Sequence, residues 1–174
     1  MKTADVIIVG SGASGLFNAL FLPQDYKVIV ITKKEVEESD SFLAQGGISA
    51  LKNPEDYDSY FEDTMKAGHY ENDKGAVEKM IKESPQIIQD LKDFGVRFDL
   101  KDGEIEFTRE GGHSTFRILH HEDLTGKEIT SHLYEEAKKR DNITIMENCT
   151  MIDIIEKDGE CKGIVYKDAD GNFD

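Results

Sequence analysis

The sequence is poor in basic residues, in long hydrophobic runs and in cysteine. Its 174 residues include 36 acidic and 21 basic side chains, which gives a formal net charge of -15. A surface of that charge repels nucleic-acid phosphates, so we expect no nucleic-acid partner. No run approaches the ~18 apolar residues of a membrane-spanning helix, and no signal peptide precedes the first predicted strand. We therefore expect no membrane contact and a cytoplasmic location.

The two cysteines, Cys149 and Cys161, show neither a CxxC nor a CxH pattern. One interpretation is a disulfide or a redox pair, and the other is two reduced thiols packed as small hydrophobic side chains. Because no secretory signal is present, we expect the reduced thiols.

Residues 6–31 have the pattern of a β-α-β unit. The apolar run Val6–Val9 predicts a strand buried on both faces. A glycine-rich segment then leads into a helical pattern that ends at Pro23, and Val28–Ile31 predicts a second buried strand. The unit implies a right-handed crossover and a parallel sheet, and hence an α/β, Rossmann-like fold.

The segment between strand and helix reads Gly10-x-Gly12-x-x-Gly15, the spacing of a dinucleotide-binding loop. Gly10 permits a tight turn, Gly12 lets the backbone approach a pyrophosphate, and Gly15 lets the helix pack close to the sheet. The helix start would face the phosphates. The predicted cofactor-binding residues here are Gly10, Ser11, Gly12, Ala13, Ser14 and Gly15.

An acidic residue that would bind a ribose is missing from the end of the second strand, which runs into Thr32, Lys33 and Lys34. Three alternatives remain at this point. The glycines form a turn without a ligand, the two lysines bind the 2′-phosphate of an NADP-type cofactor, or the loop binds a dinucleotide whose ribose is held in another way.

The rest of the chain alternates helical and strand patterns. We expect a helix over 56–67 closed by Gly68, and two helices between 74 and 94 that separate at Ser84-Pro85. Residues 96–124 have no clear period. Thr125 and Glu128 predict a capping box that opens a helix through residue 140, with a buried face of Ile129, Leu133 and Ala137.

Three further strands are expected near the end of the sequence. The segment 143–147 predicts one of them, and residues 151–156 and 162–167 predict a β-hairpin joined through Lys-Asp-Gly-Glu. A last turn signal at 168–172 leads to no predicted strand.

The segment Ala44-Gln45-Gly46-Gly47-Ile48 resembles the family of succinate dehydrogenase, fumarate reductase and L-aspartate oxidase flavoproteins. In that family the second strand ends in Ser/Thr-Lys and an A-Q-G-G-I segment follows, so the missing ribose acid is a family trait. The resemblance implies FAD as the cofactor. It adds to the predicted cofactor-binding residues Lys33, Asp40, Ser41, Phe42, Leu43, Ala44, Gln45, Gly46 and Gly47.

A histidine is also missing from the first part of the chain. Many members of this family carry a histidine five residues before the glutamine, where FAD is covalently attached. Here that position is Asp40, and residues 1–68 contain no histidine. We therefore predict that FAD binds non-covalently.

The segment Thr108–Ile129 resembles the L-aspartate oxidase branch of the family through R-E-G-G-H-S, R-I-x-H and D-x-T-G. The resemblance implies that Glu110 orients the amino group of L-aspartate, and we take Glu110 and His113 as the candidate catalytic residues. The alternatives are that Glu110 pairs with Arg109 or Arg117 and that His113 is a structural loop residue. His120 and His121 lack a second ligand cluster, so no metal is expected.

The resemblance implies FAD-dependent oxidation of L-aspartate to iminoaspartate, which feeds quinolinate and NAD synthesis. Oxygen or fumarate would be the acceptor, and quinolinate synthase is a candidate partner. Family members are much longer, so we expect residues 1–174 to be an N-terminal portion of the FAD-binding domain that does not turn over aspartate alone. The capping domain and the C-terminal helical domain would lie outside this chain. The alternatives are a fumarate reductase or succinate dehydrogenase-like flavoprotein and a flavin-binding fragment without catalysis.

Overall fold

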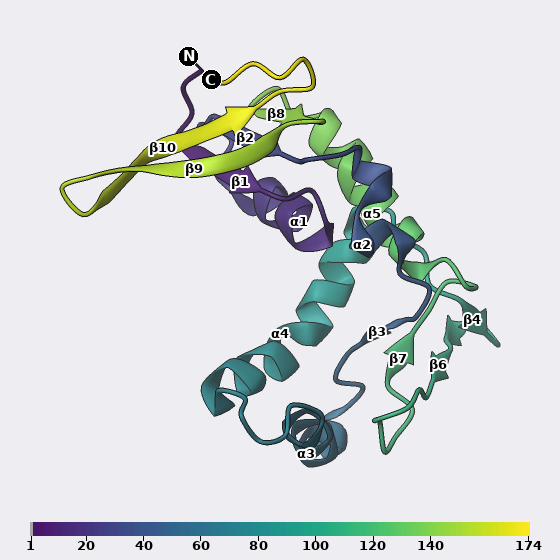
Figure 1. The fold of residues 1–174 in the computed structure, drawn as a ribbon. Coiled ribbons are helices and arrows are strands. Elements are labelled where there is room, and N and C mark those ends of the chain that lie inside the picture. The colour runs from purple at the N-terminus through teal and green to yellow at the C-terminus, as the bar shows by residue number, and fades with distance from the viewer. Residues whose placement is uncertain (1) are drawn as a thin grey trace. The chain divides into compact units, whose positions relative to one another are not determined.

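A computed structural model describes residues 2–174, and the chain divides into two compact units (Figure 1). The first unit comprises Met1–Ala44 with Ile129–Asp174, and the second comprises Gln45–Glu128.

The first unit is built on a parallel sheet of β1 (Val6–Val9), β2 (Val28–Ile31) and β8 (Ile143–Met146), in the order β1-β2-β8. Helix α1 (Ala13–Phe21) connects β1 to β2, whose residues pair in parallel register from Val6 with Val28 onward. The predicted β-α-β unit and the Rossmann-like α/β class are confirmed.

The two faces of this sheet are covered differently. On one face, Ala19 of α1 packs against Val28 and Val30, with further apolar side chains of β1 and β8 around them. All four residues of β2 are buried, as predicted. The prediction for β1 is wrong on one face, since Ile7 and Val9 are 37% and 52% exposed. Among the described residues β1 and β8 are the two edge strands of this sheet, so β1 has a neighbouring strand on one side only.

The hairpin of β9 (Thr150–Lys157) and β10 (Glu160–Lys167) lies over the other face of this sheet (Figure 1), where Ile155 and Ile164 line the same small cavity as Ile29. Asp158 and Gly159 at its turn have φ angles of 57° and 79°, a conformation that suits Asp-Gly in a two-residue hairpin loop. The predicted hairpin is confirmed. Beyond the last turn, Phe173 forms an antiparallel bridge with Lys167, which the turn signal alone did not predict.

Helix α5 (Thr125–Lys138) has the predicted buried face of Ile129, Leu133 and Ala137. Its first turn differs from the predicted capping box. The Leu124 carbonyl accepts the first helical hydrogen bond, from the Glu128 N–H, and the Thr125 hydroxyl accepts one from the His121 N–H. The helix therefore begins one residue earlier than expected.

Two short helices precede the unit boundary, η1 (Val36–Glu38) and α2 (Asp40–Leu43). In the second unit, η2 (Pro54–Asp56) leads into α3 (Tyr57–Ala67), which packs against α4 (Lys74–Asp93). Tyr60 and Met65 of α3 and Val77 and Ile81 of α4 form their shared core. The predicted helix over 56–67, closed by Gly68, is confirmed.

The break predicted at Ser84-Pro85 is wrong, because α4 continues through Pro85. A proline has no N–H for the carbonyl four residues earlier, here that of Ile81. The Ser84 hydroxyl donates to this carbonyl instead at 2.7 Å, and it accepts from the Leu51 N–H at 2.8 Å. The serine read as a helix cap therefore supplies the donor that the proline lacks.

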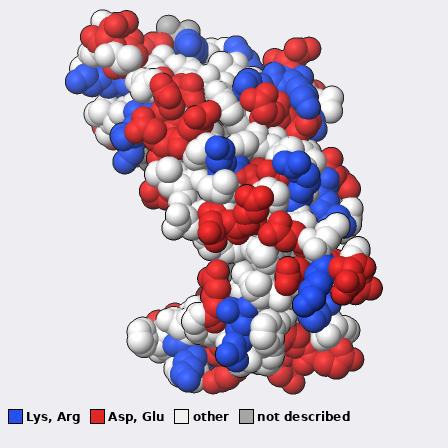
Figure 2. Space-filling view, turned by 90° about the vertical axis from the view of Figure 1, so that its right-hand side faces the viewer, with Lys and Arg blue, Asp and Glu red and all other residues white. Residues whose placement is uncertain are grey.

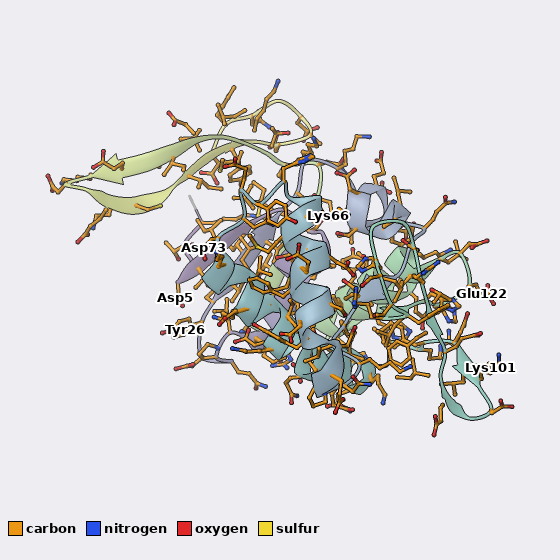
Figure 3. All side chains as sticks on the ribbon, turned by 90° about the horizontal axis from the view of Figure 1, so that it is seen from below. Asp5, Tyr26, Lys66, Asp73, Lys101 and Glu122 are labelled. Carbon is orange, nitrogen blue, oxygen red and sulfur yellow. The ribbon has the colours of Figure 1, made fainter. Side chains whose placement is uncertain are left out.

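Short strands occupy the segment without a period. There β6 (Phe107–Thr108) and β7 (Ile118–Leu119) form an antiparallel sheet with β3 (Ile48–Ser49), which lies earlier in the chain, and β4 (Leu100–Lys101) pairs with β5 (Glu104–Ile105) in a hairpin. Lys101 lies on this hairpin, where the ribbon projects from its unit (Figure 3). Two-residue strands carry no readable alternation, so the sequence pattern could not locate them.

Both cysteines are free thiols, as expected, with Cys149 buried. Cys161 is exposed, so the expectation that both are packed as hydrophobic side chains is wrong for this residue. None of the helices within residues 2–174 is long and apolar enough to cross a membrane. On the face shown in Figure 2, basic side chains lie between acidic ones.

Candidate functional site

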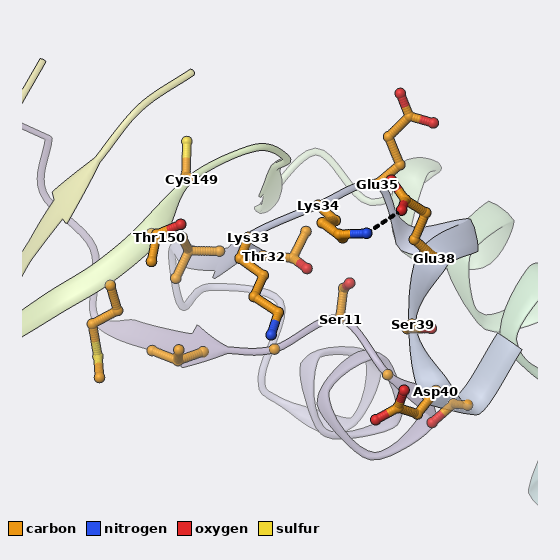
Figure 4. Close-up of a pocket in the computed structure, with 16 residues that line it drawn as sticks. Ser11, Thr32, Lys33, Lys34, Glu35, Glu38, Ser39, Asp40, Cys149 and Thr150 are labelled. Carbon is orange, nitrogen blue, oxygen red and sulfur yellow. Dashed lines mark hydrogen bonds and ion pairs between the residues drawn. The ribbon is translucent and has the colours of Figure 1, made fainter. Parts of the chain in front are cut away.

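A cavity of about 450 Å³ opens in the first unit at the carboxyl ends of its parallel strands (Figure 4). In a parallel α/β sheet this edge is where ligands bind. The predicted cofactor-binding residues that line the cavity are Gly10, Ser11, Gly12, Lys33, Asp40 and Ser41. The structure thus brings together predicted residues from the glycine loop, the end of β2 and the start of α2.

The glycine loop has the backbone geometry that its spacing predicts. Gly10 has a φ of +114°, which side-chain-bearing residues rarely adopt. A Cβ atom on Gly15 would lie 2.0 Å from the Gly10 carbonyl oxygen, so only glycine fits where α1 meets the loop. Gly12 is the N-cap of α1 and offers no side-chain hydrogen bond, which leaves the first amides of the helix to other partners.

Ser11 lies inside this cradle with 2% of its surface exposed. Its hydroxyl is buried and has no hydrogen-bond partner within the described part of the chain. A buried hydroxyl without a partner is costly, and a ligand that accepts its hydrogen bond removes that cost. Together with the uncapped start of α1, it forms a site suited to an anion such as a diphosphate.

One further part of the cavity wall was not predicted. Cys149, Thr150 and Met151 line it from the segment that follows β8. The Cys149 N–H donates to the Thr32 carbonyl at 2.9 Å, which holds this segment beside the end of β2. Burial raises the pKa of the Cys149 thiol, which favours its protonated form. The rule that ligands bind at the carboxyl ends of parallel strands could have found these residues once the third strand was placed.

The two lysines after β2 have different environments. Both lysines line the cavity, but Lys34 also forms an ion pair with Glu38, four residues later (Figure 4). The hydrogen bond and the charge of Glu38 raise the pKa of Lys34. Lys34 is therefore already neutralised by a neighbour, which weakens the interpretation of the pair as a 2′-phosphate site.

The other predicted cofactor-binding residues do not line the cavity. Ala13, Ser14 and Gly15 belong to the first turn of α1, and Phe42, Leu43 and Ala44 lie in α2 or directly after it. Gln45, Gly46 and Gly47 belong to the second unit.

In the second unit the structure brings Glu110 to the Gly46-Gly47 backbone. The Gly47 N–H donates a long hydrogen bond of 3.4 Å to Glu110 Oε1, and a Cβ atom on Gly46 would lie 3.4 Å from both carboxylate oxygens. A Cβ atom on Gly47 would lie 2.3 Å from the Leu119 carbonyl oxygen, so the close packing of Gly47 against Leu119 requires glycine. Two motifs more than sixty residues apart therefore meet at an exposed carboxylate.

Arg117 lies in the loop that joins β6 to β7, residues 109–117, which we call the Arg117 loop, and it is fully buried. Sequence reasoning did not assign it a role. Its Nε and Nη2 donate to the two carboxylate oxygens of Asp56 at 2.9 and 2.8 Å, and Nη2 also donates to Ser59 Oγ at 2.7 Å. Nη1 donates to Asp63 Oδ2 at 2.6 Å and lies 3.1 Å from His113 Nδ1. Glu110 therefore does not pair with Arg117, and one of the two alternatives for Glu110 is wrong.

The charges of this cluster stabilise one another. Hydrogen bonds from Arg117 hold the pKa of Asp56 well below its ordinary value, against the opposing effect of burial. Burial alone would raise the pKa of Asp63, but hydrogen bonds from Ser114 and Arg117 outweigh it and lower that pKa. The bond to Asp56 in turn raises the pKa of Arg117. The acidic residues at 56 and 63, each about one helical turn from buried Tyr60, were the available sequence signal.

His120 and His121 lie beside one carboxylate, with Nδ1 atoms 3.1 and 3.4 Å from Asp99. The Glu122 N–H also donates to Asp99, at 2.8 Å. No group of three or more metal-ligating side chains occurs among residues 2–174. The two histidines thus belong to a local group of polar contacts around Asp99.

The family described as FAD binding domain matches residues 5–173. The chain belongs to this family. The match covers both the cavity of the first unit and the Arg117 loop of the second. FAD, the predicted cofactor, is thereby confirmed at the level of the family. The orphaned Ser11 hydroxyl and the uncapped start of α1 fit its diphosphate.

Curated relatives are named L-aspartate oxidase. The protein of Clostridium perfringens is 42% identical over 165 residues, which cover 95% of this chain and 38% of the relative. That of Clostridium acetobutylicum is 46% identical over 160 residues, covering 91% of this chain and 37% of the relative. The chain thus spans less than two fifths of the length of these relatives.

Solved structures confirm the fold. Sdh1 of Mycobacterium smegmatis superposes with a TM-score of 0.87 at 28% identity, over 99% of this chain and 32% of that one. A quinol-fumarate reductase has a TM-score of 0.87 at 26% identity, over 96% of this chain and 30% of that one. The resemblance to the succinate dehydrogenase, fumarate reductase and L-aspartate oxidase flavoproteins is therefore confirmed.

Proposed function

We propose that this chain is part of an FAD-dependent enzyme that oxidises L-aspartate to iminoaspartate. The observation that carries the proposal is the exposed Glu110 carboxylate, held against the Gly46-Gly47 backbone. A carboxylate pairs with an ammonium group, which L-aspartate has and succinate lacks. The names of the curated relatives support the same substrate.

In this proposal the chain's own residues bind and orient. Ser11 and the start of α1 hold the diphosphate of FAD, with Lys33 and Asp40 along the same cavity. Glu110 orients the substrate ammonium, and His113, three residues later, lies on the same turn. Bound FAD would supply the hydride acceptor for the Cα–H bond. The loop therefore contributes position and charge to the reaction.

We further propose that residues 1–174 form an N-terminal portion of the FAD-binding domain and do not oxidise L-aspartate alone. The length of the relatives supports this, since the matched region covers 38% of one of them. Non-covalent attachment of FAD, a cytoplasmic location, oxygen or fumarate as acceptor and quinolinate synthase as a partner belong to the same proposal. Aspartate-dependent peroxide formation by the purified chain would contradict its inactivity.

The first test is FAD binding by the purified chain, measured from the visible flavin band after free FAD is removed. We expect retained flavin that is released by acid, since Asp40 replaces the histidine of covalent attachment. Ser11→Ala should weaken binding by about 10- to 100-fold, because it removes a hydrogen bond to a charged group. Thr144→Ala removes a hydroxyl from the exposed side of β8 and is the matched control. Equal FAD affinity of the two variants would show that Ser11 does not contribute to FAD binding.

The second test separates the two substrate classes. L-Aspartate and succinate are titrated separately against the flavin spectrum of the loaded chain. We expect a larger response to L-aspartate in the unmodified protein and no such preference in Glu110→Gln. Glu104→Gln, on the exposed β4–β5 hairpin, is the matched control.

A fumarate reductase or succinate dehydrogenase-like activity is the second candidate. The similarity to Sdh1 and to quinol-fumarate reductase favours it. This candidate predicts that succinate perturbs the flavin at least as strongly as L-aspartate and that Glu110→Gln changes neither response. A chain that binds FAD but responds to neither dicarboxylate would support the third alternative, a flavin-binding fragment without catalysis.

A further inference from the structure

Arg117 uses all five of its N–H groups. The Nε hydrogen goes to Asp56, the two Nη2 hydrogens to Asp56 and Ser59, and one Nη1 hydrogen to Asp63. The second Nη1 hydrogen is left for His113 Nδ1, at 3.1 Å. A guanidinium has five donors and no acceptor, so each contact runs from Arg117 outward.

His113 must therefore present a lone pair at Nδ1. In a neutral imidazole one ring nitrogen accepts and the other carries the proton, and the partner of one nitrogen sets the state of the other. We infer that Arg117 is a positioning residue that fixes His113 as the neutral tautomer protonated at Nε2. The loop then offers a hydrogen-bond donor at His113 in addition to the carboxylate acceptor of Glu110.

The contact with Arg117 excludes a proton on Nδ1. Such a proton would face the Nη1 hydrogen at the distance of a hydrogen bond and would break that contact. The backbone that carries the ring is also held on both sides. The His113 N–H donates to the Glu110 carbonyl, and the Ser114 N–H and hydroxyl donate to Asp63 at 2.7 and 2.8 Å.

What this inference means for substrate binding rests on the proposed function. An N–H donor suits a carboxylate oxygen, and a carboxylate acceptor suits an ammonium group. A turn that presents both groups three residues apart therefore matches an amino acid better than it matches a simple dicarboxylate. The tautomer itself requires no substrate and can be measured independently.

The test is an NMR spectrum of the chain with ¹⁵N-labelled histidine at neutral pH, which correlates each ring nitrogen with the ring protons. His113→Gln assigns the signal of His113 by its disappearance. We expect an unprotonated Nδ1 and a protonated Nε2 for His113, and exposed His69 serves as the internal comparison. Protonation at Nδ1, or at both nitrogens, would overturn the inference.

Arg117→Gln tests the cause. We expect the His113 signal to move toward the average of the two tautomers, a change that a merely structural arginine would not produce. If this variant does not fold, the spectrum of the unmodified protein still decides the tautomer. An unchanged tautomer in a folded Arg117→Gln variant would remove Arg117 from its positioning role. Failure of the aspartate titration would leave this spectrum unaffected, so the two proposals fail separately.

Discussion

The glycine loop of the first unit and the Arg117 loop of the second hold their functional groups by different means. In the glycine loop, the backbone shapes the site, with Gly10 at a positive φ and no room for a side chain at Gly15. In the Arg117 loop, a buried side chain shapes the site, through bonds to Asp56, Asp63, Ser59 and His113. The first arrangement can be read from residue spacing, whereas the second depends on which side chains meet in space.

The strongest test of this comparison is Arg117→Met. Removing one partner of a buried ion pair leaves the others buried without compensation, which costs about 3–5 kcal/mol. We expect the free energy of unfolding of the second unit to fall by that amount, measured by chemical denaturation with hydrogen exchange to locate the loss. Arg109→Met is the matched control, because Arg109 is exposed and its described contact is with the Phe116 ring. A similar loss in both variants would mean that the buried bonds of Arg117 contribute little.

Asp56→Asn sharpens the same test. Asp56 accepts two of the five Arg117 bonds, so Asp56→Asn and Arg117→Met disrupt the same ion pair. We therefore expect the loss of unfolding free energy in the double variant to be smaller than the sum of the losses in the two single variants. Strict additivity would show that the residues act separately.

Gly15→Ala tests the backbone-shaped site. The added Cβ would lie 2.0 Å from the Gly10 carbonyl oxygen, and a backbone atom cannot rotate away as a side chain can. We expect a loss of about 3 kcal/mol in the free energy of unfolding, at the upper end of overpacking costs, and loss of FAD binding. Gly12→Ala lies in the same loop, and its Cβ would meet the Ser41 hydroxyl at 2.8 Å, which can turn aside. Its stability should therefore stay within about 1 kcal/mol of the unmodified protein.

Prediction from sequence succeeded where the determining interactions are local. The spacing of Gly10, Gly12 and Gly15, the apolar run of β2, the Asp158-Gly159 turn and the buried face of α5 each follow from neighbouring residues. The chain segment after β8 was missed as part of the cavity because its place depends on which strands are neighbours in the sheet.

The Arg117 cluster was missed for a related reason. Its carboxylate partners lie 61 and 54 residues away, so no spacing along the chain relates them. The helix break predicted at Pro85 failed because the Ser84 hydroxyl donates to the nearby Ile81 carbonyl, and this hydroxyl also binds distant Leu51. Side-chain hydrogen bonds, above all those between distant segments, are therefore what the sequence reading could not supply.

Ser84→Ala measures the side-chain bond that compensates for Pro85. The change leaves the Ile81 carbonyl and the Leu51 N–H without their partner, which costs about 1–3 kcal/mol. In a Pro85→Ala background the new N–H can reach the Ile81 carbonyl, so the same change should cost less there. Denaturation of the four proteins in this cycle gives the coupling directly. Equal costs in both backgrounds would show that Ser84 does not replace the donor missing from Pro85.

Acidification has the mildest expected effect, since it weakens the Arg117 cluster without removing any atom. The folded pKa values of Asp56 and Asp63 lie below their ordinary value of 3.8. A carboxyl group with a lowered folded pKa stabilises the fold above its unfolded pKa, and this stability is lost as the pH falls toward the folded value. Unfolding free energies should therefore decline below about pH 5, where the unfolded chain begins to take up protons. Since Arg117→Met removes the main cause of the Asp56 shift, it should make this decline shallower. An equal decline in that variant would place the acid sensitivity in other carboxylates.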